Sequence, residues 1–242
     1  NPLWIAFNSS PTMTMTDKNG YYNWDPYGTI QANAYGIIAA SESERRRDVF
    51  SGHIDLKFNI IKGLTFTSSN GVDYYNNTSY SFTPQAVNGA GKNSMGNSNL
   101  QRMLLQSSNN ITYNHTWNDK HYLTVTGVWE ATKSTIRNMG ISGSSLQAES
   151  VGWWDVKNAV TRDATNGYSD WALLSGVGRV IYNYDNRYML TGTFRADGSS
   201  RFTNDKWGYF PSVAVAWTAS NESFMESTRD LISNLKIRAS YG

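Results

Sequence analysis

The 242-residue sequence predicts an all-β protein built on an antiparallel sheet. Apolar and polar residues alternate with a period of two in segments of about ten residues, as in strands with one polar and one apolar face. Turn residues separate these segments, and no apolar pattern with the helical period continues for long. We therefore expect about eight strands, joined mostly as hairpins.

The first expected hairpin lies at residues 54–74. Apolar and polar residues alternate before its turn, in the order Ile54, Asp55, Leu56, Lys57, Phe58, Asn59 and Ile60. The turn is Ile61–Gly63, and the returning strand follows from Leu64 to Tyr74. A short turn between two alternating segments is the usual signal of a β-hairpin.

Two more hairpins and a final pair of strands follow the same pattern. The second hairpin turns at 118–120, and its apolar positions are Met103, Leu105, Ile111, Tyr113, Trp117, Leu123, Val125, Gly127 and Trp129. The third turns at 185–187, with Leu174, Gly176, Gly178, Val180, Tyr182, Tyr184, Tyr188, Leu190, Gly192 and Phe194. The final pair contains Val213, Val215, Trp217, Leu235, Ile237, Ala239 and Tyr241. Between its strands, residues 219–233 are expected to contain a short helix, which Ser220 or Asn221 can cap.

Composition and charge exclude several classes of protein. With 39% hydrophobic residues and a mean hydropathy of -0.51, no segment approaches the roughly 18 apolar residues of a membrane helix. A membrane barrel stays possible, because only alternate residues of its strands face lipid. A net charge of +2 without a long basic run argues against nucleic acid as a partner.

Residues that carry enzyme chemistry are sparse. The sequence contains no cysteine, and its three histidines are His53, His115 and His121. None of these histidines lies in a carboxylate pattern with the spacing of a metal site or a catalytic triad. We therefore expect no catalytic residues, no metal site and no cofactor, and we do not expect an enzyme.

The expected connections differ in length from one end of the sheet to the other. Tight turns contrast with long stretches at about 1–45, 76–99 and 135–170, which we interpret as extracellular loops, because outer-membrane barrels have this asymmetry. Four aromatic residues lie near the short turns on the apolar side, where a lipid–water boundary would place them: Trp117, Tyr184, Tyr188 and Trp217. Packing in a soluble core is the alternative.

The second half of the chain contains a long, ordered set of motifs. The segments, in order, are Phe194–Phe202, Trp207–Ser212, Ala216–Trp217, Asn221–Met225 and Leu235–Gly242. This set resembles the barrel signature of SusC/RagA transporters, and Ile61–Leu64 resembles an earlier turn of those proteins. Ser9–Met13 with Asp17–Tyr21 is similar to one of their loops.

The resemblance implies a fold, a location and partners. It implies an outer-membrane barrel of 22 strands with an N-terminal plug, to which residues 1–242 contribute about eight strands and no plug. It also implies TonB-dependent import of oligosaccharides or peptides, together with a SusD-like lipoprotein. Two alternatives are a passive outer-membrane porin and a secreted glycan-binding β protein.

Two groups of residues are candidates for a functional role. Four aromatic residues in or beside the 135–170 stretch can stack on a substrate or pack locally: Trp153, Trp154, Tyr168 and Trp171. The other group is the central run of the signature, which we expect to fold a loop rather than bind a ligand: Asp197, Gly198, Ser199, Ser200, Arg201 and Phe202.

Overall fold

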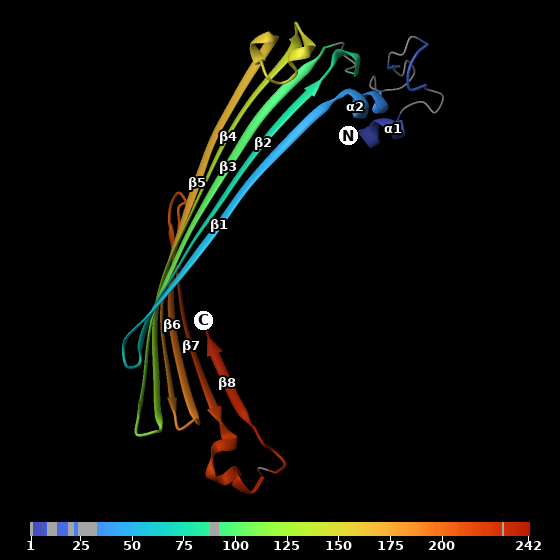
Figure 1. The fold of residues 1–242 in the computed structure, drawn as a ribbon. Helices are drawn as coiled ribbons and strands as arrows, with labels where there is room; N and C mark the ends of the chain where they lie inside the picture. Colours follow the sequence, from blue (N-terminus) through green and yellow to red (C-terminus); the bar gives the residue numbers. More distant parts are fainter. Residues whose placement is uncertain (1, 9–13, 19–21, 24–32, 88–91, 229) are drawn as a thin grey trace. The chain divides into compact units, whose positions relative to one another are not determined.

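The computed structural model describes residues 2–8, 14–18, 22–23, 33–87, 92–228 and 230–242. Within these residues, eight strands form one sheet in chain order from β1 to β8 (Figure 1). The strands are β1 (Glu42–Ile61), β2 (Leu64–Thr83), β3 (Ser94–Trp117), β4 (His121–Leu146), β5 (Ala159–Tyr184), β6 (Tyr188–Ser199), β7 (Trp207–Thr218) and β8 (Lys236–Tyr241). The expected all-β antiparallel fold is confirmed.

The helical elements are short. They are α1 (Pro2–Asn8), α2 (Ala34–Ala40), η1 (Gln85–Val87), η2 (Glu149–Val151), η3 (Val156–Asn158), η4 (Ala219–Asn221) and η5 (Ser223–Thr228). In the described part of the chain, none of them has the length and apolar character needed to cross a membrane. The 3-10 helices η4 and η5 lie where a short helix was expected.

The three expected hairpin turns are confirmed. Gly63 closes the β1–β2 turn with a φ of 83°, a conformation that glycine adopts without steric cost. The other two turns have positive φ at consecutive residues: Asn118 and Asp119 between β3 and β4, and Asp185 and Asn186 between β5 and β6. Such turns match the twist of paired strands, and Asn and Asp tolerate them better than most residues.

The prediction of long loops is wrong for two of the three ranges. The ranges 76–99 and 135–170 are mostly strand, because β2 continues to Thr83, β3 begins at Ser94, β4 continues to Leu146 and β5 begins at Ala159. These strand ends are rich in Ser, Thr, Asn and Gly and lack the apolar alternation on which the prediction depended. The expected loop 1–45, like the loop resemblance at 9–21, falls partly outside the described residues.

The first five strands are long. They contain between 20 and 26 residues each, whereas about 9–11 residues of a tilted strand cross a bilayer. Each of these strands is therefore about twice as long as a membrane crossing requires.

The chain divides into two compact units. Unit 1 consists of residues 1–49, 74–102 and 136–169, and unit 2 consists of 50–73, 103–135 and 170–242. Within unit 1, the buried apolar residues Phe82, Met95, Leu146 and Ala159 form a small core.

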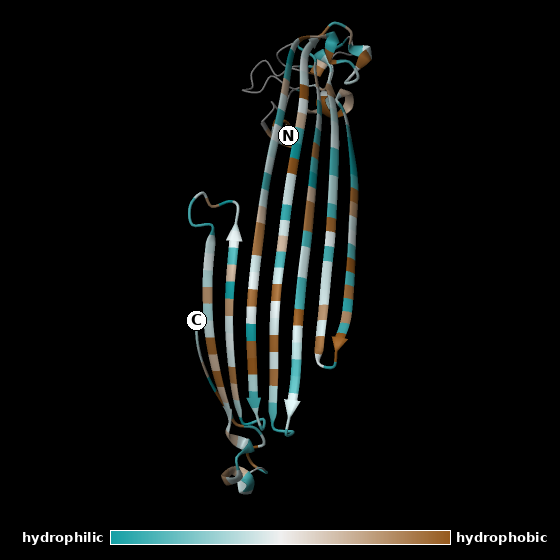
Figure 2. Cartoon of the chain, turned by 90° about the vertical axis from the view of Figure 1, so that its left-hand side faces the viewer, coloured by the Kyte–Doolittle hydropathy of each residue, from teal (hydrophilic) through white to brown (hydrophobic). Residues whose placement is uncertain are grey.

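In unit 2, the strand register separates apolar from polar side chains. Val180 lies opposite Gly192 and Gly192 opposite Val213, whereas the neighbouring row contains Arg179, Thr193 and Ser212. Side chains alternate between the two faces of a sheet, so each row belongs to one face. We call them the apolar face and the polar face, and the alternating brown and teal bands of individual strands in Figure 2 follow this separation.

Side-chain contacts extend both faces to β1–β4. Phe66 stacks between Phe58 and Trp129, with ring centroids 6.3 and 5.9 Å apart. On the polar face, Ser69 donates a hydrogen bond to Asp55 and Ser108 donates one to Glu130. Together with the strand register, these contacts show which residues lie on the apolar face. The following positions that the sequence predicted to be apolar lie there: Ile54, Leu56, Phe58, Ile60, Leu105, Ile111, Tyr113, Leu123, Val125, Val180, Leu190, Val213 and Val215.

Aromatic rings gather at the short-turn end of unit 2, as expected. His121 contacts the rings of Trp117 and Tyr184 at 5.1 and 4.9 Å, and Tyr184 stacks on Tyr188 at 6.4 Å. Trp217 lies opposite Tyr188 in the β6–β7 register. We call Trp117, His121, Tyr184, Tyr188 and Trp217 the aromatic row.

Four polar residues interrupt the apolar face: Ser68 and Asn70 on β2, and Ser107 and Asn109 on β3. The Asn70 amide donates to the Ser68 hydroxyl at 2.9 Å, and the Asn109 amide donates to the Ser107 hydroxyl at 3.1 Å. Each pair satisfies part of its own hydrogen-bonding capacity, which lowers the cost of placing these groups among apolar neighbours.

We predict that nitroxide labels on the two faces of unit 2 report different environments in the bilayer-embedded parent protein. Labels at Val180 and Val213 should collide mainly with oxygen, which partitions into hydrocarbon. Labels at Arg179 and Ser212, one residue away on the same strands, should collide mainly with a water-soluble nickel complex. The reverse result would place the sheet one residue out of register, since a slip of one residue exchanges the faces.

Candidate functional site

Polar contacts, some of them buried, hold the connection 147–158 between β4 and β5. Asn93 is buried; its side-chain amide donates to the Leu146 carbonyl at 3.0 Å, and its oxygen accepts from the Leu146 amide. The Glu149 carboxylate accepts hydrogen bonds from the backbone amide of Gln85 at 2.6 Å and from the side-chain amide of Asn93 at 2.9 Å. These contacts tie the connection to the segment between β2 and β3.

Trp153 packs within unit 1 and does not present its ring as a free surface. It lies against the small core, together with Val151 and Val156, and stacks on Tyr80 at 6.0 Å. Its carbonyl accepts a hydrogen bond from Asn97 at 3.0 Å. Of the two readings of Trp153 that the sequence allows, the contacts favour local packing.

The other three aromatic candidates have different surroundings. Trp154 is 75% exposed and lies 5.8 Å from the Tyr80 ring. Tyr168 is exposed on β5 and is not itself in the connection. Trp171, also on β5, belongs to unit 2, where the Arg201 guanidinium lies 5.1 Å from its ring centroid. The structure thus brings Trp153 and Trp154 together around Tyr80.

A hollow of about 640 Å³ lies on the sheet of unit 1. Small residues with hydroxyl groups dominate its lining, including Ser43, Ser79, Ser81, Ser98, Ser142 and Thr165. Arg45 on β1 and Asp163 on β5 also line it. Hydroxyl groups donate and accept hydrogen bonds, so this surface can bind a ligand rich in hydroxyl or amide groups. We call it the hydroxyl hollow.

The hydroxyl hollow and the Trp153 packing lie on opposite faces of the unit 1 sheet. Ser81 bonds to the Gly96 carbonyl in the lining, whereas the residues on either side, Phe82 and Met95, point into the small core. Sequence reasoning missed this hollow. Its signal was present as small polar residues at alternate positions, as in Ser79 and Ser81 or Asp163 and Thr165.

Two of the three histidines bond to a neighbouring polar side chain. Across the described residues, no group of three or more His, Asp or Glu side chains is arranged to hold a metal ion. His53 bonds to Asp55 at 2.9 Å and His121 bonds to the Tyr182 hydroxyl at 2.6 Å. Both histidines are therefore engaged in pairs on the sheet.

The signature run closes β6 onto its two neighbouring strands. Ser200 exchanges two hydrogen bonds with the backbone of Ala172 on β5, at 2.8 and 2.9 Å. Asp197 accepts two hydrogen bonds from Arg195, at 2.9 and 2.7 Å. Gly198 lies opposite Trp207, and a β-carbon there would meet the indole ring at 3.0 Å. The expectation of a loop is therefore wrong for Asp197–Ser199, which end β6 and pair with their neighbours, and it holds only from Ser200 onward. Arg201 and Phe202, which follow, are exposed.

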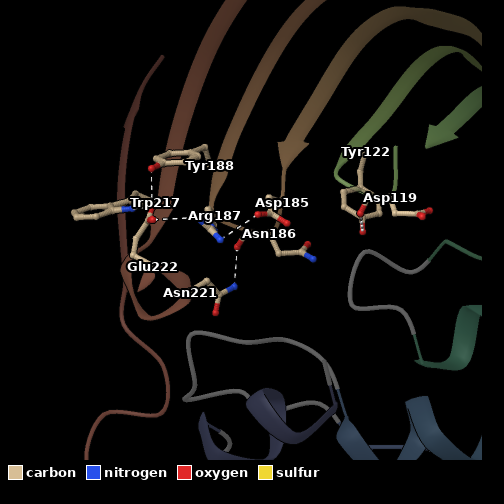
Figure 3. A network of polar contacts seen from close by, with 9 residues as sticks. All are labelled: Asp119, Tyr122, Asp185, Asn186, Arg187, Tyr188, Trp217, Asn221 and Glu222. Atoms are coloured by element: carbon tan, nitrogen blue, oxygen red, sulfur yellow. Dashed lines mark hydrogen bonds and ion pairs between the residues drawn. The ribbon is translucent and has the colours of Figure 1, made fainter. Parts of the chain in front are cut away.

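Glu222 joins three residues at the short-turn end (Figure 3). Its carboxylate accepts hydrogen bonds from the Tyr188 hydroxyl at 2.6 Å, the Trp217 indole at 3.0 Å and the Arg187 guanidinium at 3.3 Å. Arg187 also pairs with Asp185 at 3.2 Å. The hydrogen bonds from Tyr188 and Trp217, followed by the charge of Arg187, lower the pKa of Glu222.

The comparisons with known proteins agree on one class. No family model matches the chain. Two TonB-dependent receptors of Formosa agariphila are 31% and 29% identical over 96% and 98% of the chain, which spans 22% and 24% of their lengths. The TonB-dependent receptor SusC of Bacteroides thetaiotaomicron is 45% identical over 71 residues, 29% of the chain and 7% of SusC.

Solved structures show the same fold. The RagAB peptide transporter superimposes with a TM-score of 0.72 at 21% identity, over 92% of this chain and 26% of that chain. The RagAB peptide importer in its open-open state gives 0.71 over 93% and 26%. The chain thus spans about a quarter of the proteins that it matches.

Fold and comparisons together define the class of protein. An antiparallel sheet with one apolar and one polar face fits a segment of a β-barrel wall, which is also the fold of the matched solved structures. The chain belongs to the SusC/RagA type of TonB-dependent receptors, as part of their barrel. The relatives are receptors and transporters, in agreement with the expectation that the chain is not an enzyme.

We predict that Glu222 makes the connection 219–235 sensitive to acid. Because its pKa is lowered, its stabilising contribution is complete above the ordinary pKa of a glutamate and disappears as the pH falls through the lowered value. Hydrogen-exchange protection of the connection, corrected for intrinsic rates, should therefore fall on acidification. In Glu222→Gln it should already be low at neutral pH, whereas Glu226→Gln serves as the control. Equal protection in wild type and Glu222→Gln at neutral pH would contradict this.

Proposed function

We propose that the chain forms part of the barrel wall of an outer-membrane, TonB-dependent importer. The observation that carries the proposal is the apolar face of unit 2, which ends in the aromatic row. A soluble monomer rarely exposes a contiguous apolar surface of more than a few hundred Å². A bilayer accounts for both features, because hydrocarbon covers the apolar face and amphipathic rings collect at the interface.

The lengths of β1–β5 support the same proposal. The membrane accounts for only part of the length of each strand, and we assign the connection 147–158 to the extracellular side. Long extracellular and short periplasmic connections are the rule in outer-membrane barrels. The complete protein would contain the further strands of a 22-stranded barrel and a plug.

For the substrate we propose an oligosaccharide or a peptide. The relatives include SusC and the RagAB peptide transporter. Two surfaces of unit 1 suit such substrates. The hydroxyl hollow offers hydrogen-bond donors and acceptors beside the opposite charges of Arg45 and Asp163. The exposed ring of Trp154, beside the half-buried Tyr80, is available for stacking.

We also propose a SusD-like lipoprotein and the TonB complex as partners, with lipid around the apolar face. The relatives support this choice over a passive porin, because they are TonB-dependent receptors. The apolar face argues against a secreted glycan-binding protein, which would have to cover it with a second layer.

Deletion of the parent gene tests the proposed function. We expect the deletion strain to lose growth on one oligosaccharide or peptide source and to grow normally on the corresponding monomer. Reintroducing the gene should restore growth. Unimpaired growth of the deletion strain on every glycan and peptide tested would remove the support for active import.

Substitution of the two neighbouring tryptophans separates ligand contact from packing. We expect Trp154→Ala to weaken substrate binding about two- to tenfold, since an aromatic contact is worth about 0.5–1.5 kcal/mol beyond area burial. Trp153→Ala should instead destabilise unit 1 by up to about 3 kcal/mol, because its ring packs on the small core. Trp153→Phe is the matched control. Calorimetric titration measures the change in affinity, and thermal unfolding measures the change in stability. An unchanged affinity in Trp154→Ala would contradict a contact between this ring and the substrate.

A further inference from the structure

The connection between β7 and β8 differs from the other connections at the short-turn end. The β1–β2, β3–β4 and β5–β6 hairpins turn within two or three residues, whereas residues 219–235 contain η4, η5 and a following turn. This connection displays large apolar side chains: Phe224 is 64% exposed and Leu231 is 88% exposed. Ile232 and Leu235 are exposed as well. A connection that faced only water would have no need of them.

Hydrogen bonds hold this connection against the barrel wall. Glu222 accepts from Tyr188, Trp217 and Arg187, as described above, and Asn221 donates to the Asn186 carbonyl at 3.0 Å. Further along, the amides of Leu231 and Ile232 bond to the Thr228 carbonyl at 3.0 and 2.8 Å. The exposed apolar side chains therefore project from an ordered segment that is attached to the aromatic row.

The apolar surface of the connection continues that of the sheet. Phe224 contacts Trp217, with ring centroids 6.4 Å apart. Trp217 lies on the apolar face, in one row with Tyr188 on β6 and Ile237 on β8. At the C-terminal end of the connection, Leu235 immediately precedes β8. Whatever covers the apolar face at Trp217 therefore reaches Phe224 too.

We propose that residues 219–235 form an interfacial membrane anchor, in which Phe224, Leu231 and Ile232 enter the boundary between lipid headgroups and acyl chains. The proposal rests on the proposed membrane barrel and adds a second lipid contact outside its strands. Amphipathic segments with bulky apolar residues lie in this zone, at a depth of about 5–10 Å. Residues 219–235 contain three acidic residues and one basic residue, so the anchor suits a zwitterionic lipid surface better than an anionic one.

Site-directed labels test the anchor in the intact parent protein. The 242 residues contain no cysteine, so single cysteines can be placed at Phe224, Leu231 and Ser233, with any cysteines elsewhere in the parent protein replaced. Val213 on the apolar face serves as the reference for hydrocarbon. Each variant carries a nitroxide and is reconstituted into phosphatidylcholine vesicles. Power-saturation measurements then compare collisions with oxygen and with a water-soluble nickel complex.

We expect the ratio of oxygen to nickel collisions at Phe224 and Leu231 to lie severalfold above that at Ser233 and below that at Val213. Ratios at Phe224 and Leu231 equal to that at Ser233, with a hydrocarbon reading at Val213, would overturn the anchor and leave the membrane barrel intact. Low collision rates with both reagents would also overturn it, because they indicate contact with protein. An aqueous reading at Val213 would overturn the membrane barrel together with the anchor.

Discussion

The antiparallel backbone ladder is the constraint on which the rest of this structure depends. Once two strands are paired, side chains alternate between the faces of the sheet, so the parity of each residue decides its surroundings. Val180 and Arg179 are neighbours in the sequence, but the rows to which they belong lie on opposite faces of the sheet. The turn residues maintain this parity, because a turn with one residue more or less would place the returning strand with its faces exchanged. Asn118, Asp119, Asp185 and Asn186 adopt the positive φ that these tight turns require.

The same rule gives the chain different surfaces at different places. In unit 2 it produces an apolar and a polar face, with the aromatic row at the short turns. In unit 1 it directs Phe82 and Met95 into a small core on one side, and Ser81 into the hydroxyl hollow on the other. Strands of similar backbone geometry thus serve both packing and recognition. The polar pairs Asn70–Ser68 and Asn109–Ser107 show that the apolar face tolerates exceptions where polar groups bond to each other.

Polar contacts determine where the chain outside the strands is held. Asn93 and Glu149 fasten the β4–β5 connection to the segment after β2. Glu222 fastens the β7–β8 connection to the β5–β6 hairpin and to Trp217. In both places one or two polar side chains join segments that are distant in sequence, and aromatic or apolar residues are displayed beside them. An ordered connection can present such residues to a substrate or to lipid with less loss of conformational entropy than a flexible one.

The sequence by itself determined the fold class, the number of strands, the tight turns and the apolar positions of unit 2, because period-two alternation and turn chemistry are local properties. The motifs from Phe194 to Gly242 likewise sufficed to identify the family. The strand ends within 76–99 and 135–170 escaped prediction, since their Ser, Thr and Asn residues leave no apolar pattern. Tertiary structure alone placed Trp153 against Phe82 and Met95, and Trp171 beneath Arg201. It alone brought Glu222 to Tyr188, because contacts between distant residues depend on how the strands pair and not on local sequence.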